Sequence, residues 1–139
     1  IVAGEGPARL GLAAGGLESR VELFGRVPSV PAVLAALDVC VFPSSEPGIP
    51  TSLLEAAALG RPIVATDVPG VNEVFEDGRE IVLVPRGDAA ALAGAVCDLL
   101  GDPDRARALG DAVRLHVIDD SSASAAAARE LALIRMLTG

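Results

Sequence analysis

The chain has 139 residues, a length that suits one domain and allows about two thirds of the unfolded surface to be buried. Its formal net charge of −8 at pH 7 argues against nonspecific binding to nucleic acid or to anionic membrane surfaces, because both would repel it. The sequence contains no uncharged apolar run of about eighteen residues, no signal peptide and no basic amphipathic helix. We therefore expect a single domain over residues 1–139 with no membrane span.

Short apolar strand patterns alternate with helical patterns along the chain, which predicts a parallel α/β sheet with helices on both faces. The predicted strands cover Ile1–Ala3, Val21–Phe24, Val39–Phe42, Pro62–Ala65 and Ile81–Val84. The predicted helices cover Ala8–Ala14, Val30–Leu37, Thr51–Leu59, Gly70–Phe75 and Asp88–Leu100, the last of which ends at Gly101. Asp102 is predicted to cap a further helix whose first residue is Pro103. A final helix is predicted from near Ser122 to Leu137.

The two cysteines and the one histidine are too few to make a zinc site or a nucleophilic triad. Cys40 lies in a buried-strand pattern and Cys97 in a helix, so both are interpreted as reduced core thiols rather than a disulfide. A reducing, cytoplasmic location follows from that interpretation. His116 is an isolated histidine in a late helix, which argues against metal or base chemistry.

The most informative segment follows the apolar strand Val39–Phe42. Pro43–Pro50 contains three prolines, two serines and one glycine, so the chain must leave the sheet there. Pro50 suits the first position of a helix that Gly60 ends. A helix N-terminus carries unpaired amides and about half a positive charge, so a diphosphate over Gly48–Ser52 would need no lysine. Glu55, about one turn inside the helix, could accept both hydroxyls of a ribose.

This segment resembles the donor-site region of GT-B glycosyltransferases of the retaining family 4 group. The matching residues, in order, are Pro43-Ser44, Gly48-Ile49-Pro50, Leu54-Glu55-Ala56-Ala57-Ala58, Gly60, Pro62-Ile63-Val64-Ala65-Thr66, Gly70 and Glu73. The resemblance extends back through Val2–Pro7 and Val21–Val27, forward through Ile81–Pro85 and the helices after it, and so covers nearly the whole chain.

The resemblance implies a Rossmann-like C-terminal domain, truncated at its start, that binds a nucleotide-diphosphate sugar. It implies metal-independent, retaining hexosyl transfer, without a cofactor, to an acceptor held by a separate N-terminal domain, so this chain alone should be inactive. The implied catalytic residue is Glu46. The implied donor-binding residues are Gly4, Gly6, Pro7, Gly25, Arg26, Val27, Gly48, Ile49, Pro50, Thr51, Ser52, Glu55 and Glu73.

Two departures from the family pattern stand out. Glu46 and Glu55 have eight residues between them where the family has seven, and Pro47 aligns with the first family glutamate. Either the turn shifts by one residue and returns Glu46 to the pocket, which we favour because loops absorb insertions, or that contact is lost. The second departure is the absence of the family's arginine and lysine that neutralise the leaving diphosphate, which precede the turn at Gly4.

Each of these residues also has a structural interpretation. Gly4, Gly6 and Pro7 suit a simple tight turn, Arg26 a solvated loop, and Glu55 or Glu73 an exposed helix surface. The hydroxyls of Ser44, Ser45, Thr51 and Ser52 suit helix capping.

Two other functions remain open. One is a non-catalytic nucleotide-binding or protein-interaction module. The other, which we favour less, is a nucleotide-sugar epimerase, because such enzymes usually lack the Gly-Ile-Pro turn before Leu-Glu-Ala.

Overall fold

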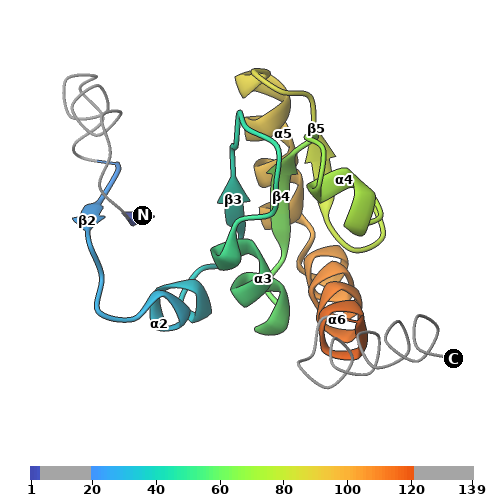
Figure 1. Ribbon diagram of the computed structural model, residues 1–139. Coiled ribbons are helices and arrows are strands. Elements are labelled where there is room, and N and C mark those ends of the chain that lie inside the picture. The colour runs from blue at the N-terminus through green and yellow to red at the C-terminus, as the bar shows by residue number, and fades with distance from the viewer. Residues whose placement is uncertain (4–19, 121–139) are drawn as a thin grey trace, which may run out of the picture.

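The computed structural model describes residues 1–3 and 20–120 of the chain (Figure 1). Several predictions fall outside these residues. They are the turn at Gly4, Gly6 and Pro7, the helix Ala8–Ala14 and the final helix from near Ser122 to Leu137.

The described strands are β1 (Val2–Ala3), β2 (Leu23–Gly25), β3 (Cys40–Phe42), β4 (Ile63–Thr66) and β5 (Val82–Val84). The described helices are α2 (Val30–Ala35), α3 (Thr51–Ala58), α4 (Val71–Val74), α5 (Ala89–Gly101) and α6 (Pro103–Asp120). Each strand and helix predicted within the described part of the chain is confirmed, with ends shifted by at most two residues. The parallel α/β class is therefore confirmed.

The sheet differs from the single continuous one that the alternating pattern predicted. Strands β3, β4 and β5 form one parallel sheet in that order, with Cys40 opposite Ile63 and Val64 opposite Val82. Strands β1 and β2 pair in parallel as a separate sheet, which lies apart from β3 in Figure 1. The pattern could predict each strand but not which edges meet, because pairing depends on residues distant in sequence.

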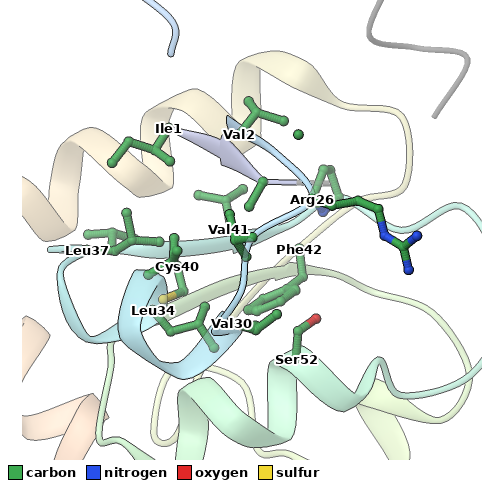
Figure 2. A pocket seen from close by; sticks show the side chains of 16 residues that line it. Ile1, Val2, Arg26, Val30, Leu34, Leu37, Cys40, Val41, Phe42 and Ser52 are labelled. Atoms are coloured by element: carbon green, nitrogen blue, oxygen red, sulfur yellow. The ribbon is translucent and has the colours of Figure 1, made fainter. Parts of the chain in front are cut away.

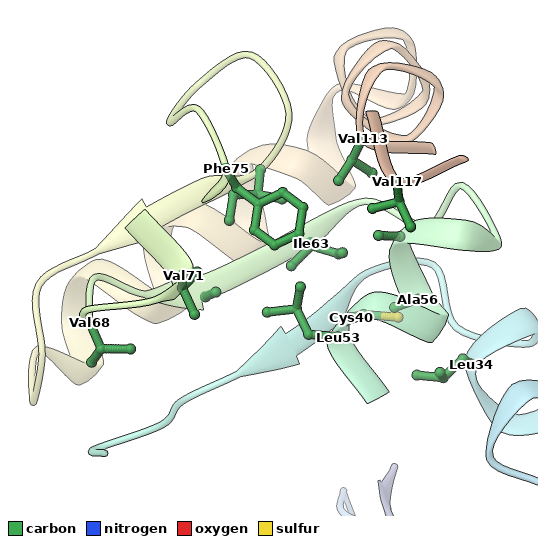
Figure 3. Close-up of a cluster of buried hydrophobic side chains, with 13 residues drawn as sticks. Leu34, Cys40, Leu53, Ala56, Ile63, Val68, Val71, Phe75, Val113 and Val117 are labelled. Atoms are coloured by element: carbon green, nitrogen blue, oxygen red, sulfur yellow. The ribbon is translucent and has the colours of Figure 1, made fainter. Parts of the chain in front are cut away.

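Strand β4 lies at the centre of the three-stranded sheet and is buried on both faces. Its side chains alternate, so Ile63 and Ala65 join one apolar cluster and Val64 joins the other. The first cluster is covered by α3, α4 and α6, and Figure 3 shows its side chains converging around Ile63. The second lies under α5 and the start of α6 and contains Val64, Val84, Leu99, Ala106 and Leu109.

Helix α3 ends as predicted, at a glycine in the left-handed region. Gly60 has φ 66°, its N–H donates to Ala57 O at 2.9 Å, and the Arg61 N–H donates to Ala56 O at 3.0 Å. This pair of bonds is the Schellman motif, which satisfies the last carbonyls of a helix. The backbone of Gly60 touches Gly110 of α6 so closely that a Cβ on Gly110 would collide with the Gly60 carbonyl oxygen.

The predicted end of α5 at Gly101 is confirmed, and Asp102 takes the boundary position after it. The Asp102 Oδ1 accepts from the Arg105 N–H at 3.0 Å and so caps α6. Cys97 is free but exposed, so it is no core thiol, whereas Cys40 is free and buried as predicted. Burial raises the Cys40 pKa to about 11, with nearby Arg61 acting in the opposite direction.

Candidate functional site

Two loops meet at the carboxyl edge of the three-stranded sheet, one after β3 and one after β4. The Gly48 N–H donates to Pro69 O at 2.8 Å. Gly70 has φ 96°, and a Cβ there would lie 3.0 Å from the Gly48 Cα. Both glycines have positive φ, a conformation that L side chains rarely adopt. Glycine at position 70 is therefore what allows the two backbones to touch.

The turn after β3 is held by Ser44. Its N–H donates to Phe42 O at 3.0 Å, and its hydroxyl donates to Glu46 O at 3.1 Å. The Glu46 N–H in turn donates to the Ser44 Oγ at 3.4 Å. The Glu46 side chain is exposed at the tip of this turn. Whether a one-residue shift returns it to a bound sugar stays a prediction.

Pro50 is the residue before α3 rather than its first helical residue, which corrects the prediction by one position. Its φ of −61° and ψ of 136° are extended, and no side chain caps the helix among the described residues. The capping interpretation of the Ser44, Ser45, Thr51 and Ser52 hydroxyls is therefore wrong for α3. The Pro50 carbonyl accepts from the N–H groups of Leu53 and Leu54, which leaves the amides of Thr51 and Ser52 without a described partner.

The remaining predicted residues around α3 differ in burial. Ile49 is partly buried and packs against the first apolar cluster, so its side chain fixes the loop to the core. Glu55 is half-buried in α3, and its carboxylate has no hydrogen bond or ion pair with any other described residue. Glu73 is exposed in the first turn of α4.

The loop after β4 has a brace that sequence reasoning missed. The Asn72 side-chain amide donates to the Asp67 carboxylate at 2.6 Å, and the Asp67 N–H donates to Val84 O at 2.8 Å. An aspartate directly after a buried strand was the available signal. The brace fixes the chain on either side of Gly70.

A pocket of about 860 Å³ brings together residues from two predicted groups (Figure 2). Gly25 ends β2, Arg26 and Val27 follow it, and Ser52 lies in the first turn of α3; all four line this pocket. In Figure 2 the Arg26 guanidinium points away from the apolar lining, while Ser52 lies at its border. Most other lining residues are apolar and come from β1, α2 and β3; we call this space the inter-sheet pocket.

A smaller pocket of about 270 Å³ lies where β3, β4 and β5 end. Ser44, Ser45, Thr66 and Arg86 line it. Arg86 was not singled out from the sequence, although an arginine two residues after β5, at the edge where open α/β sheets bind ligands, was a usable signal. It adds a cation at the edge where the candidate loops lie.

The His116 side chain contacts Glu80 and Phe75, and the argument against metal or base chemistry at this residue stays a prediction. Its Nδ1 lies 2.8 Å from a Glu80 carboxylate oxygen, and its ring packs 5.5 Å from that of Phe75. Within residues 1–3 and 20–120, no three histidine, cysteine or acidic side chains gather as a metal site. No helix in the same residues is long and apolar enough to cross a membrane.

Comparison with known proteins places these features in a family. The family model described as glycosyl transferases group 1 matches residues 1–102. The 2-deoxystreptamine N-acetyl-D-glucosaminyltransferase of Streptomyces fradiae is 38% identical over 112 residues, which are 76% of this chain and 27% of that enzyme. This chain thus spans about a quarter of that relative's length.

Solved structures agree on the fold. Sucrose-phosphate synthase from Thermosynechococcus elongatus is 30% identical and aligns with a TM-score of 0.84 over 96% of this chain and 37% of its own. S. aureus TarM, solved in complex with UDP among other ligands, is 24% identical with a TM-score of 0.84 over 94% of this chain and 28% of its own, a likeness of fold alone. Since the family model covers well over half of its residues, this chain belongs to the group 1 glycosyltransferase family.

Proposed function

We propose that this chain is the donor-binding domain of a glycosyltransferase and that it binds a nucleoside diphosphate sugar at the carboxyl edge of its sheet. The observation that carries the proposal is the N-terminus of α3, which has free amides and no side-chain cap within the described structure. Family membership supports the same function.

In this proposal the diphosphate lies over Gly48–Ser52, where the amides of Thr51 and Ser52 donate to its oxygens. The helix dipole adds a favourable field for the negative charge. Glu55 accepts the ribose hydroxyls, since its half-buried carboxylate has no other described partner. Arg26 and the backbone of Gly25 border the nucleobase.

The proposed chemistry is retaining, metal-independent hexosyl transfer. As the diphosphate leaves, positive charge develops on the anomeric carbon of the sugar and negative charge on the leaving group. The amides at the start of α3 stabilise the leaving group, and Glu46 binds the sugar hydroxyls. The acceptor is held by a further domain, which also completes the active enzyme. A cytoplasmic location stays a prediction.

Calorimetric titration of the chain with UDP, GDP and ADP and their sugars tests the donor site. UDP comes first because TarM, which shares the fold, was solved with it. We expect one nucleotide to bind selectively. Glu55→Gln should weaken binding by about 10- to 100-fold, because it removes a charged acceptor that contributes roughly 1.5–3 kcal/mol.

Glu22→Gln is the matched control, since it makes the same change of charge at an exposed residue before β2, at the opposite edge. Its affinity should equal that of the unmodified chain. Absence of binding by every nucleotide would contradict the donor site and favour the protein-interaction module. Equal binding by both variants would remove Glu55 from the site.

A further inference from the structure

The loop after β4 is closed by a side-chain hydrogen bond across its base. The Asn72 side-chain amide donates to the Asp67 Oδ1 at 2.6 Å, five residues away in sequence. A charged acceptor makes such a bond shorter and stronger than one between neutral groups. The backbone turns within the same span, since the N–H groups of Val71 and Asn72 both donate to Val68 O, at 3.1 and 3.2 Å. Residues 67–72 therefore form one closed turn, which we call the β4–α4 loop.

The β4–α4 loop is anchored on both sides of its middle. The Asp67 N–H donates to Val84 O at 2.8 Å, which ties the start of the loop to the end of β5. Val68 and Val71 are 2% and 1% exposed and belong to the first apolar cluster (Figure 3). Between them, Pro69 is exposed and Gly70 is half-buried. The loop thus presents the peptide between Pro69 and Gly70 at the carboxyl edge of the sheet.

This peptide holds the loop that follows β3. The Pro69 carbonyl accepts from the Gly48 N–H at 2.8 Å. The direction of that carbonyl depends on ψ of Pro69 and on φ of Gly70. The proline ring restricts φ but not ψ, and glycine is the least restricted residue at φ, so neither residue fixes the direction by itself. The bond between Asp67 and Asn72 spans this peptide and so limits its rotation.

The Gly48 N–H in turn attaches the turn that precedes α3. Gly48 lies two residues before Pro50, and α3 begins directly after Pro50 at Thr51. Ile49 packs against the first apolar cluster, so the bond from Gly48 is a second attachment of this turn. A displacement of about 1 Å in groups that position a ligand is enough to weaken a site strongly. The direction of the Pro69 carbonyl therefore matters for whatever binds at the start of α3.

We propose that Asp67 and Asn72 are positioning residues of the donor site. Their hydrogen bond aims the Pro69 carbonyl at the Gly48 N–H and thereby holds the turn that precedes α3. Neither side chain touches the nucleotide, because both act through the backbone of Pro69 and Gly48. The step from this turn to nucleotide affinity rests on the proposed function, whereas the step from the two side chains to Gly48 does not.

A reciprocal exchange of the two residues tests the proposal. Asn72→Ala removes the donor without adding charge, and Asn72→Asp places two carboxylates opposite each other, so both lose the bond. Asp67→Asn combined with Asn72→Asp restores an amide-to-carboxylate bond at the unmodified net charge. Amide hydrogen exchange of the 139-residue chain, followed by NMR without nucleotide, reports on the bond at Gly48. We expect the Gly48 N–H to exchange at least about tenfold faster in both single variants and within about twofold of the unmodified rate in the double variant.

The Gly60 N–H is the internal reference, since it donates to Ala57 O at 2.9 Å at the other end of α3. Its exchange should be the same in every variant. Equal acceleration at Gly48 and Gly60 in the single variants would show a general loss of stability and overturn the proposal. Unchanged exchange at Gly48 in Asn72→Ala would overturn it as well, and so would exchange that stays fast in the double variant.

Calorimetric titration with UDP adds the functional readout. We expect Asn72→Ala to bind UDP at least about tenfold more weakly than the unmodified chain, and the double variant to recover to within about twofold. Weak binding in Asn72→Ala with normal exchange at Gly48 would overturn the positioning role, because the loss would then come from direct contact with the nucleotide. Absence of UDP binding by the unmodified chain would count against the proposed function alone, because exchange at Gly48 is measured without nucleotide.

Discussion

The two ends of α3 are both held by a contact between two glycines, yet they have different surroundings. At the C-terminal end Gly60 lies against Gly110, which is buried where α6 crosses the helix. At the N-terminal end Gly48 lies against Gly70 in two loops with largely exposed side chains. The first contact lies in the core, and the second joins two loops at the carboxyl edge of the sheet.

The ends also differ in how their backbone groups are satisfied. The Schellman motif pairs the C-terminal carbonyls within the chain. The N-terminal amides of Thr51 and Ser52 have no described partner, whereas Asp88 and Asp102 cap the starts of α5 and α6. The carbonyls at the C-terminal end of α3 are thus paired, whereas the first amides at its N-terminal end have no described partner. Unpaired amides at a helix N-terminus are the groups that bind an external anion.

The largest effect is expected from Gly110→Ala. The new Cβ would collide with the Gly60 carbonyl oxygen, so α6 must move away from α3. We expect a loss of about 3 kcal/mol in the free energy of unfolding, measured by urea denaturation. Gly94→Ala in α5 is the control, since nothing lies within 4 Å of its Cβ; it should be neutral or stabilising by up to about 1 kcal/mol. Equal stabilities of the two variants would contradict a close crossing.

Gly70→Ala should reduce stability less and nucleotide binding more. Alanine at φ 96° is strained, and its Cβ would press on the Gly48 backbone, so we expect a stability loss of about 2 kcal/mol and at least about tenfold weaker nucleotide binding by calorimetry. Gly78→Ala separates the two causes, because Gly78 has φ 73° and nothing within 4 Å. The free energy of unfolding of Gly78→Ala should fall by about 1 kcal/mol, and this variant should bind nucleotide normally. If both variants bind equally well, the Gly48–Gly70 contact does not arrange the site.

The same contrast explains how much of the structure was predictable. The strand β4 and the end of α3 at Gly60 were predictable, because continuous apolar runs and left-handed glycines act locally. The contacts Gly48–Gly70 and Gly60–Gly110 were not, because each joins segments more than twenty residues apart in sequence. The separation of the two sheets was missed for the same reason.

The residues of the candidate site stay a prediction, and the sequence did not show how they are arranged. The sequence identified Arg26 and Ser52, and the structure places both beside one pocket. The Ile49 side chain packs against the core, which the sequence did not show, and its predicted role in donor binding stays a prediction. Arg86 and the Asp67–Asn72 bond were missed, because their significance depends on the end of β5 lying beside the end of β4.

The smallest effect on stability should come from filling the open end of α3. In Pro50→Asp the new carboxylate can accept from the first-turn amides, as Asp88 does from the Ala91 N–H at 2.8 Å in α5. Compared with Pro50→Ala, which removes the same proline, Pro50→Asp should have a free energy of unfolding higher by about 1 kcal/mol. The carboxylate would then occupy the amides proposed for the diphosphate and repel it, so nucleotide affinity should fall at least about tenfold. A more stable variant that still binds nucleotide normally would show that the anion lies elsewhere, and that the open end of α3 is no binding feature.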